Sequence, residues 1–259
     1  MANTAEESLT GSDMVSIKAH NLSIQFPVYN AAHRSFRGNF IKVATGGRFS
    51  SDVTNHVYIN ALDQINLNIQ NGERVALLGH NGSGKSTLLR AIAGVYYPTG
   101  GSLEVEGSIS TLIDLHQGMD AEATGWDNII LRGLAMGMSR AEINGRKNEI
   151  AEFSELGDFL NIPVRTYSSG MKLRLAFSVS TSSPRNIVLM DEWLSTGDAS
   201  FSEKATLRLI DYLGKASILV IATHSEKLAM RICDRIVTLS HGKVENDSPV
   251  ISQEKDFII

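Results

Sequence analysis

One segment of the chain has the residue types and spacing of a loop that binds phosphate groups. It reads G-x4-G-K-S and follows the apolar run Arg74–Leu78. Glycines let the backbone turn so that successive amides point at the phosphates. Lys85 would bond the β- and γ-phosphates, Ser86 would be a Mg²⁺ ligand, and the following helix N-terminus adds partial positive charge. The predicted nucleotide-binding residues are Gly79, His80, Asn81, Gly82, Ser83, Gly84, Lys85, Ser86 and Thr87.

Two adjacent carboxylates stand at the end of a second apolar run. Ile187–Met190 is followed by Asp191 and Glu192. Such an aspartate can hold Mg²⁺ through water, and the neighbouring glutamate can orient or deprotonate an attacking water. Apolar strands that end in acids are common, so this interpretation depends on its pairing with the phosphate loop.

A helix start rich in small residues is the third candidate for phosphate contact. Tyr167-Ser168-Ser169-Gly170 precedes a predicted helix over 171–179, and Gly170 lies 21 residues before Asp191. A helix N-terminus without bulky side chains can approach a phosphate closely and donate backbone amides to it. Alone it would be an ordinary capped helix.

With these residues in place, the chain resembles the ABC-type ATPases over about residues 15–243. The segment Tyr167–Met171 is similar to the family signature, usually written LSGGQ, with Ser168 and Gly170 retained and Ser169 in place of a glycine. The resemblance implies that Ser168, Ser169 and Gly170 act on the nucleotide held by a second copy. It also implies that ATP is bound together with Mg²⁺, through Ser86 and Asp191.

The resemblance assigns two further residues and the catalytic roles. Asp198 matches the aspartate of the family's D-loop, and His224, after the run Ile218–Ala222, matches its switch histidine. Glu192 and His224 are therefore expected to be catalytic. Glu192 would polarise the attacking water, and His224 would stabilise charge on the transferred phosphoryl group.

Two positions of the family pattern have more than one candidate. The residue that senses the γ-phosphate could be Gln117, Asp114 or His116. The aromatic residue that stacks on adenine is best matched by Phe26, with Tyr29 and Tyr58 as alternatives. A core aromatic is an equal interpretation for each of the three.

The details of these motifs resemble the subfamily that exports lipid-linked polysaccharides such as O-antigen, capsule and teichoic acid. Thr124–Ile129 is similar to that group's LTGREN helix start, and the stretch after Asp191 also matches. Only 17 residues follow Gly242, so the chain is expected to be a short form without a carbohydrate-binding domain.

The resemblance also implies partners and a location. Two copies would hold two ATP molecules between them as a symmetric homodimer. A separate dimeric membrane subunit would dock near residues 112–118 and the helical subdomain. The protein would lie peripherally on the cytoplasmic face of the inner membrane. The alternatives are the ATPase of a transporter for another substrate, and an ABC ATPase that acts without a membrane partner.

The elements that must position these residues alternate between strand and helix. Apolar patterns predict strands over 15–26, 62–69, 74–78, 187–190, 217–222 and 235–239, with a helix over 85–93. Ser139 caps a helix whose apolar face includes Ile143, Ile150, Phe153, Leu156 and Leu160. The expected fold is an α/β P-loop ATPase core with a parallel sheet, an N-terminal antiparallel β subdomain and an inserted helical subdomain over about 118–180.

The expected boundaries are a tail over 1–14, the ATPase domain over 15–243 and a tail over 244–259. Within the domain, residues 27–59 form an insertion longer than a hairpin needs, with a net charge of +3 and interleaved phenylalanines. One hypothesis is that it contacts the membrane subunit or anionic headgroups. A solvated loop is the simpler interpretation.

Composition excludes several classes of protein. A net charge of −4 over 259 residues gives no electrostatic case for binding nucleic acid. The single cysteine, Cys233, excludes a disulfide framework and a cysteine-based zinc cluster. No apolar run reaches the ~18–20 residues of a membrane-spanning helix.

Overall fold

The computed structural model describes residues 15–28, 49–51, 57–113, 118–192 and 199–250. The strands are β1 (Ser16–Val28), β2 (Phe49–Ser51), β3 (Val57–Gln70), β4 (Arg74–Leu78), β5 (Gly100–Glu106), β6 (Ile109–Leu112), β7 (Ile187–Asp191), β8 (Ile218–Ala222), β9 (Arg235–Ser240) and β10 (Lys243–Pro249). The helices are α2 (Lys85–Ile92), α3 (Gly125–Ala135), α4 (Arg140–Ser154), α5 (Ser169–Ser180), α6 (Ala199–Gly214) and α7 (Glu226–Ile232), with short 3₁₀ helices η2 (Gly157–Asn161) and η3 (Val164–Thr166).

A mostly parallel sheet of six strands, in the order β10-β9-β4-β8-β7-β6, forms the centre of the fold. All its pairings are parallel except that of β10 with β9. Strands β7 and β8 are buried along nearly their whole length. Unbroken apolar runs are typical of parallel strands that are covered on both faces, and the sequence shows this pattern at Ile187–Met190 and Ile218–Ala222.

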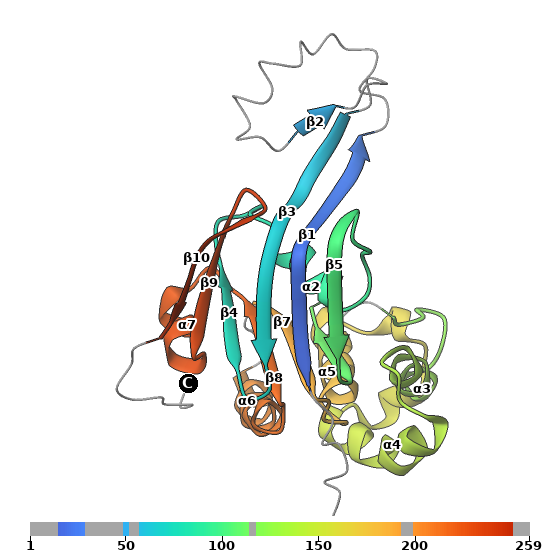
Figure 1. Ribbon diagram of the computed structural model, residues 1–259. Coiled ribbons are helices and arrows are strands. Elements are labelled where there is room, and N and C mark those ends of the chain that lie inside the picture. The colour runs from blue at the N-terminus through green and yellow to red at the C-terminus, as the bar shows by residue number, and fades with distance from the viewer. Residues whose placement is uncertain (1–14, 29–48, 52–56, 114–117, 193–198, 251–259) are drawn as a thin grey trace, which may run out of the picture.

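The second sheet is antiparallel, with the order β2-β3-β1-β5, and its long strands β1 and β3 run past the first sheet (Figure 1). Its apolar side chains, with Leu88 and Leu89 of α2, form one core against the parallel sheet. The simple alternation expected along β3 is broken, because Gln64 has a φ of +53° and the register with β1 shifts nearby. This bulge keeps both Leu62 and Ile65 buried, although they lie three residues apart.

Helices α3, α4 and α5 form the helical subdomain, which lies to one side of the two sheets (Figure 1). Ser139 caps α4 as predicted, through a hydrogen bond from the Glu142 amide at 3.1 Å. The predicted apolar face does not continue along one helix, because α4 ends at Ser154 and Glu155 adopts a φ of +56°. Leu156 and Leu160 lie beyond that end, yet both are buried in the same cluster as Ile143 and Ile150.

Two predicted boundaries differ from the structure. Residues 243–249 form strand β10, which pairs with β9 along its whole length, so the folded domain extends past the predicted limit at 243. The predicted insertion over 27–59 begins and ends inside strands, because β1 continues to Val28 and β3 starts at Val57. Helix α6 begins at Ala199.

Glu142 joins α4 to the segment that follows α5, and it makes stability depend on pH. Its carboxylate accepts a hydrogen bond from the Ser183 hydroxyl and lies 3.6 Å from the Arg185 guanidinium. The Ser183 hydrogen bond is the main reason that the pKa of Glu142 falls below its ordinary 4.5, with the Arg185 charge adding to it against partial burial.

We therefore predict that Glu142→Gln lowers the free energy of unfolding by about 1 kcal/mol at pH 7. A carboxylate with a lowered folded pKa stabilises the protein above its unfolded pKa and loses that contribution as the pH falls through the folded value. The difference between variant and parent should therefore shrink below pH 4.5. Urea unfolding at pH 7 and pH 4 measures it, with Glu152→Gln on the exposed side of α4 as control. An equal difference at both pH values would contradict the prediction.

Candidate functional site

The phosphate loop connects β4, in the middle of the parallel sheet, to α2. Its three glycines all adopt positive φ angles, +147° at Gly79, +77° at Gly82 and +114° at Gly84. A Cβ atom on Gly79 would lie 2.2 Å from the Leu239 carbonyl oxygen, and one on Gly84 would lie 2.9 Å from that of Ala61. Glycine is therefore required at these two positions by backbone conformation and by contact with neighbouring strands.

The turn between β9 and β10 contacts the phosphate loop and helps to fix its conformation. The Gly242 amide donates to the Ser83 carbonyl oxygen at 2.8 Å, and the Gly242 carbonyl oxygen accepts from the Asp63 amide at 2.8 Å. The ring of His241 lies beside that of His80, with centroids 5.2 Å apart. The loop is thus fixed by residues about 160 positions away in the chain, which the sequence analysis did not identify.

Lys85 and the start of α2 have the chemistry that a phosphate group needs. The Lys85 ammonium group donates to the carbonyl oxygens of Gly79 at 2.6 Å and His80 at 3.2 Å, so it lies inside the curve of the loop. Among the residues that the structure describes, no side chain caps α2, and the first turn of this helix carries no acidic residue. The first amides of the helix are therefore not taken up by a side-chain cap, and an anion can accept their hydrogen bonds.

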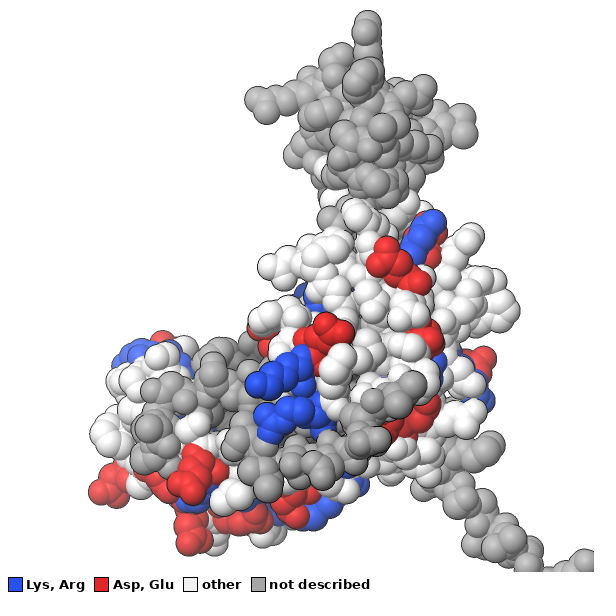
Figure 2. Space-filling model, turned by 90° about the vertical axis from the view of Figure 1, so that its left-hand side faces the viewer, with Lys and Arg blue, Asp and Glu red and all other residues white. Residues whose placement is uncertain are grey.

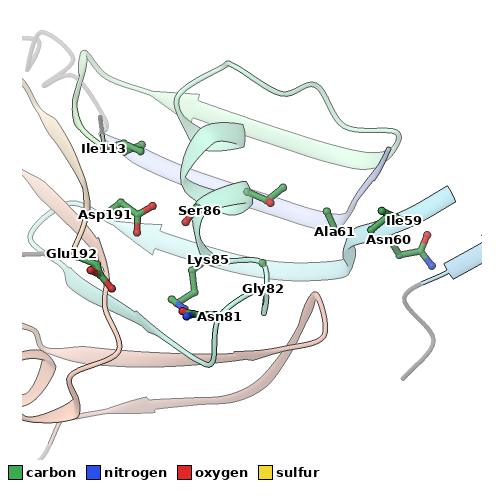
Figure 3. Close-up of a pocket in the computed structure, with 12 residues that line it drawn as sticks. Ile59, Asn60, Ala61, Asn81, Gly82, Lys85, Ser86, Ile113, Asp191 and Glu192 are labelled. Atoms are coloured by element: carbon green, nitrogen blue, oxygen red, sulfur yellow. The ribbon is translucent and has the colours of Figure 1, made fainter. Parts of the chain in front are cut away.

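A cavity of about 590 Å³ opens over this loop. Figure 3 shows Asp191 and Glu192 at one end and Ile59, Asn60 and Ala61 at the other, with Lys85 and Ser86 between them. The cavity is also lined by Asn81, Gly82, Gly84, Thr87 and Ile113. The phosphate loop and the two predicted carboxylates, which are over 100 residues apart in the sequence, therefore face one space.

The residues at the carboxylate end suit a hard divalent cation. The Ser86 hydroxyl and the Asp191 carboxylate both line the cavity, and oxygen donors of this kind are the ligands that Mg²⁺ prefers. The Ser83 hydroxyl is buried and has no hydrogen-bond partner among the described residues. The donor set therefore fits the predicted magnesium site.

Glu192 is held in an unusual conformation next to His224. Its φ is +64°, which is rare for a residue with a side chain, and its amide donates to the Ala222 carbonyl oxygen at 2.7 Å. The Glu192 carboxylate lies 2.7 Å from Nδ1 of His224, and both side chains are exposed. A left-handed residue directly after a buried strand turns its side chain toward the cavity and the histidine, as expected for a functional site.

The small-residue helix start lies elsewhere on the chain. Ser168 caps α5 by accepting from the Met171 amide at 3.2 Å, and α5 begins two residues earlier than predicted. We call Ser168, Ser169 and Gly170 the tip. All three are exposed, and none of them is among the described residues that line the cavity. The tip and the cavity are therefore two separate surfaces of the described part of the chain.

Phe26, the best match for the residue that stacks on adenine, pairs with Ile59 of β3, which lines the cavity, and its role stays a prediction. Phe26 itself is absent from the described residues that line the cavity, and its ring packs edge-on against Tyr96, with centroids 5.1 Å apart. Phe26 is thus a partly buried residue of the core. The end of the cavity remote from Asp191 is lined by Ile59, Asn60 and Ala61 of β3, which carry no recognisable signal in the sequence. Gln117, Asp114, His116, Asp198 and Tyr29 lie outside the described residues.

A groove lies between the core and the helical subdomain. It has a volume of about 280 Å³ and is lined by Arg90, Ala93, Val95, Thr111, Ile113, Gly118, Arg132, Ala135 and Met136. Ile113 lines both this groove and the cavity over the phosphate loop. Val95 is an exposed apolar side chain of this lining, so part of the groove surface is apolar.

Two features of the described residues bear on partners. Their helices include none that is long and apolar enough to cross a membrane. On the face that carries β10 and α7, basic and acidic side chains are interspersed, and neither sign covers it (Figure 2).

Comparison with known proteins places the chain in a family. The sequence profile described as "ABC transporter" matches residues 62–195, just over half of the chain. The O-antigen export system ATP-binding protein RfbE of Yersinia enterocolitica is 44% identical over 91% of this chain and 98% of its own length. The protein of the same description, RfbB, of Myxococcus xanthus is 40% identical over 87% of this chain, which spans only 52% of that relative.

A solved structure has the same fold. It is the dimeric, post-hydrolysis state of an ATP-binding cassette bound to ADP and Pi, which is 23% identical and matches 91% of this chain with a TM-score of 0.65. The family match, the extensive identity to RfbE and the cavity built from the phosphate loop and two carboxylates agree with one another. The chain belongs to the ABC transporter family.

Proposed function

We propose that this protein is the ATP-hydrolysing motor subunit of an exporter that moves a lipid-linked, O-antigen-like polysaccharide through a separate membrane subunit. The observation that carries the proposal is the cavity in which the phosphate loop faces Asp191 and Glu192. The two relatives named for O-antigen export support the substrate class. The protein would work at the cytoplasmic face of the inner membrane, bound to that subunit.

ATP would occupy the cavity with its phosphates on the loop and its base toward β3. Lys85 and the first amides of α2 would bind the phosphate oxygens, and Ile59–Ala61 would contact the base and ribose. Bound Mg²⁺, held by Ser86 and through water by Asp191, would neutralise charge on the β- and γ-phosphates. Glu192 would accept a proton from the attacking water, and His224 would orient the Glu192 carboxylate and stabilise charge on the γ-phosphoryl group.

The exposed tip of α5 would complete the site of a second copy. Because the tip and the cavity lie on different parts of one chain, two chains related by a twofold axis could each supply the missing half to the other. Two ATP molecules would then hold the dimer together, and loss of the γ-phosphate would weaken those contacts. Gln117 and Asp198 are proposed to contact the same nucleotides.

The groove beside the helical subdomain is the proposed docking site for the membrane subunit. Its exposed apolar residue Val95 suits an apolar helix, while Arg90 and Arg132 add positive charge. Ile113 connects this groove to the cavity over the phosphate loop, so a partner seated there would contact a wall of the nucleotide site. The basic insertion is proposed to contact the same partner or lipid headgroups.

Lys85→Ala should lose nucleotide binding. The ammonium group is the only lysine or arginine group among the described residues that line the cavity, so its removal leaves the phosphates without a cationic partner. We expect ATP affinity to fall at least about 100-fold, or ~3 kcal/mol. Titration with a fluorescent ATP analogue measures this, with Lys215→Ala, at the residue directly after α6, as control. Undiminished affinity would refute the assignment.

Glu192→Gln should separate ATP binding from hydrolysis. The amide cannot accept the proton, so we expect kcat to fall by about 10²–10⁴-fold while ATP affinity stays near the parental value. The variant should also accumulate as an ATP-bound dimer, visible by light scattering during size-exclusion chromatography. Glu245→Gln on β10 is the control. Hydrolysis at the parental rate by the Glu192 variant would show that another group is the base.

Val95→Asp should uncouple hydrolysis from export. A carboxylate in the groove would oppose an apolar helix, whereas Val95 does not line the nucleotide cavity among its described residues. We expect basal ATPase activity within about twofold of the parent and loss of surface polysaccharide in complemented cells. Leu207→Asp, an equally exposed leucine on α6, is the control. Normal export with Val95→Asp would place the docking site elsewhere.

A further inference from the structure

One buried side chain organises the loop that precedes α3. Asn128 is 1% exposed, and its Oδ1 accepts from the Asp120 amide at 2.8 Å. Its Nδ2 donates to the carbonyl oxygens of Asp120 at 2.9 Å, Ala123 at 3.3 Å and Thr124 at 2.9 Å. A single side-chain amide therefore contacts four backbone groups of residues 120–124.

This loop pairs with the segment that leads into the tip. The Val164 amide donates to the Ala123 carbonyl oxygen at 3.0 Å, and the Arg165 amide donates to that of Ala121 at 2.8 Å. In addition to these backbone hydrogen bonds, the Arg165 guanidinium forms an ion pair with the Glu122 carboxylate at 2.8 Å. We call residues 120–124 and 163–165, together with Asn128, the brace.

The brace continues directly into Tyr167 and the tip. The Tyr167 amide donates to the Val164 carbonyl oxygen at 3.0 Å, and its hydroxyl donates to that of Phe159 at 2.6 Å. The ring is 5% exposed and fits against Gly125, where a Cβ atom would lie 2.4 Å from the hydroxyl oxygen. Ser168 begins the tip at the next residue. The backbone before the tip is thus held both by the loop that Asn128 organises and by the burial of Val164 and Tyr167 in the subdomain cluster.

The other end of the brace lies next to the groove. Gly118, two residues before Asp120, lines the groove together with Ile113 and residues of α3, the helix that carries Asn128. The body of α5 has its own support, because Leu175 and Val179 are buried in the subdomain cluster. Loss of the brace would therefore displace the tip without removing the packing that holds α5.

We propose that Asn128 is a positioning residue that, through the brace, sets where the tip of α5 is presented to the nucleotide bound by a second copy. This inference rests on the proposed ATP-bound dimer. It predicts that weakening the brace lowers turnover and dimer formation but leaves the affinity of a single chain for ATP unchanged, because the phosphate loop has separate supports in β3 and the β9–β10 turn.

Asn128→Asp is the direct test. The carboxylate keeps the size of the side chain but replaces its donor with an acceptor that faces three carbonyl oxygens. In the nucleotide-free monomer, we expect amide hydrogen exchange of residues 163–171 to become about tenfold faster, with no change over residues 79–88. We also expect kcat to fall about tenfold with the KM for ATP unchanged. The matched control is Asn246→Asp, an exposed asparagine on β10.

Arg165→Glu tests the same proposal without changing a buried group. Exposed ion pairs add little to stability, so this variant should fold like the parent. It places like charges together across the brace, so we expect a fewfold lower kcat that is restored by the double variant Glu122→Arg with Arg165→Glu. Charge reversal of the exposed pair formed by Asp211 of α6 and Lys215, directly after that helix, is the control and should leave kcat unchanged.

The outcomes separate the two proposals. Faster exchange at the tip together with lower kcat, and weaker ATP-driven dimerisation in the Glu192→Gln background, would support the brace. If Glu192→Gln dimerises with ATP and Asn128→Asp changes neither that dimer nor the exchange of 163–171, the brace role is wrong and the proposed function stands. If Glu192→Gln forms no dimer with ATP, both are wrong. If Asn128→Asp lost ATP affinity by the same factor as it lost kcat, Asn128 would have only a general structural role, and the proposal would be overturned.

Discussion

The functional site depends first on the conformation of the phosphate loop, whose backbone lies in direct contact with neighbouring strands. Gly79 and Gly84 lie so close to the carbonyl oxygens of Leu239 and Ala61 that no side chain could stand between them. The Gly242 amide then bonds the loop at Ser83. Amides aimed at an anion are an unfavourable arrangement for a free backbone, so rigid surroundings are what keep them in place.

A second constraint is the separation of the site into two surfaces. The cavity is formed between the two sheets, whereas the tip of α5 belongs to a subdomain with its own apolar cluster. The subdomain has its own cluster around Ile143 and Leu175, and it also buries Phe153 and Phe177 in the cluster that covers the parallel sheet. Ile113 and Gly118 lie where core and subdomain meet. This division suits a protein whose proposed work is to convert the presence of a γ-phosphate into movement.

Much of the fold and half of the site could be predicted from the sequence, because the relevant signals are local. The phosphate loop, the run before Asp191 and the cap at Ser168 each depend on a few consecutive residues. The role of Phe26 stays a prediction, because its ring packs against Tyr96 and no local pattern records such tertiary packing. The bulge at Gln64 and the early end of α4 at Ser154 were not predicted from the sequence, for a related reason. Burial recruits residues such as Leu160 from outside the helix whose periodicity they continue. Asn128 has no pattern of its own, since its partners are backbone atoms.

The place of the β9–β10 turn in the chain has a consequence for biosynthesis. Strand β4 and the phosphate loop are made early, yet their neighbours β8, β9 and Gly242 come from the last third of the sequence. A chain still emerging from the ribosome therefore has the glycines and the lysine but lacks the strands and the amide that hold them. The contacts that hold the phosphate loop can therefore form only after residues 218–242 have been made.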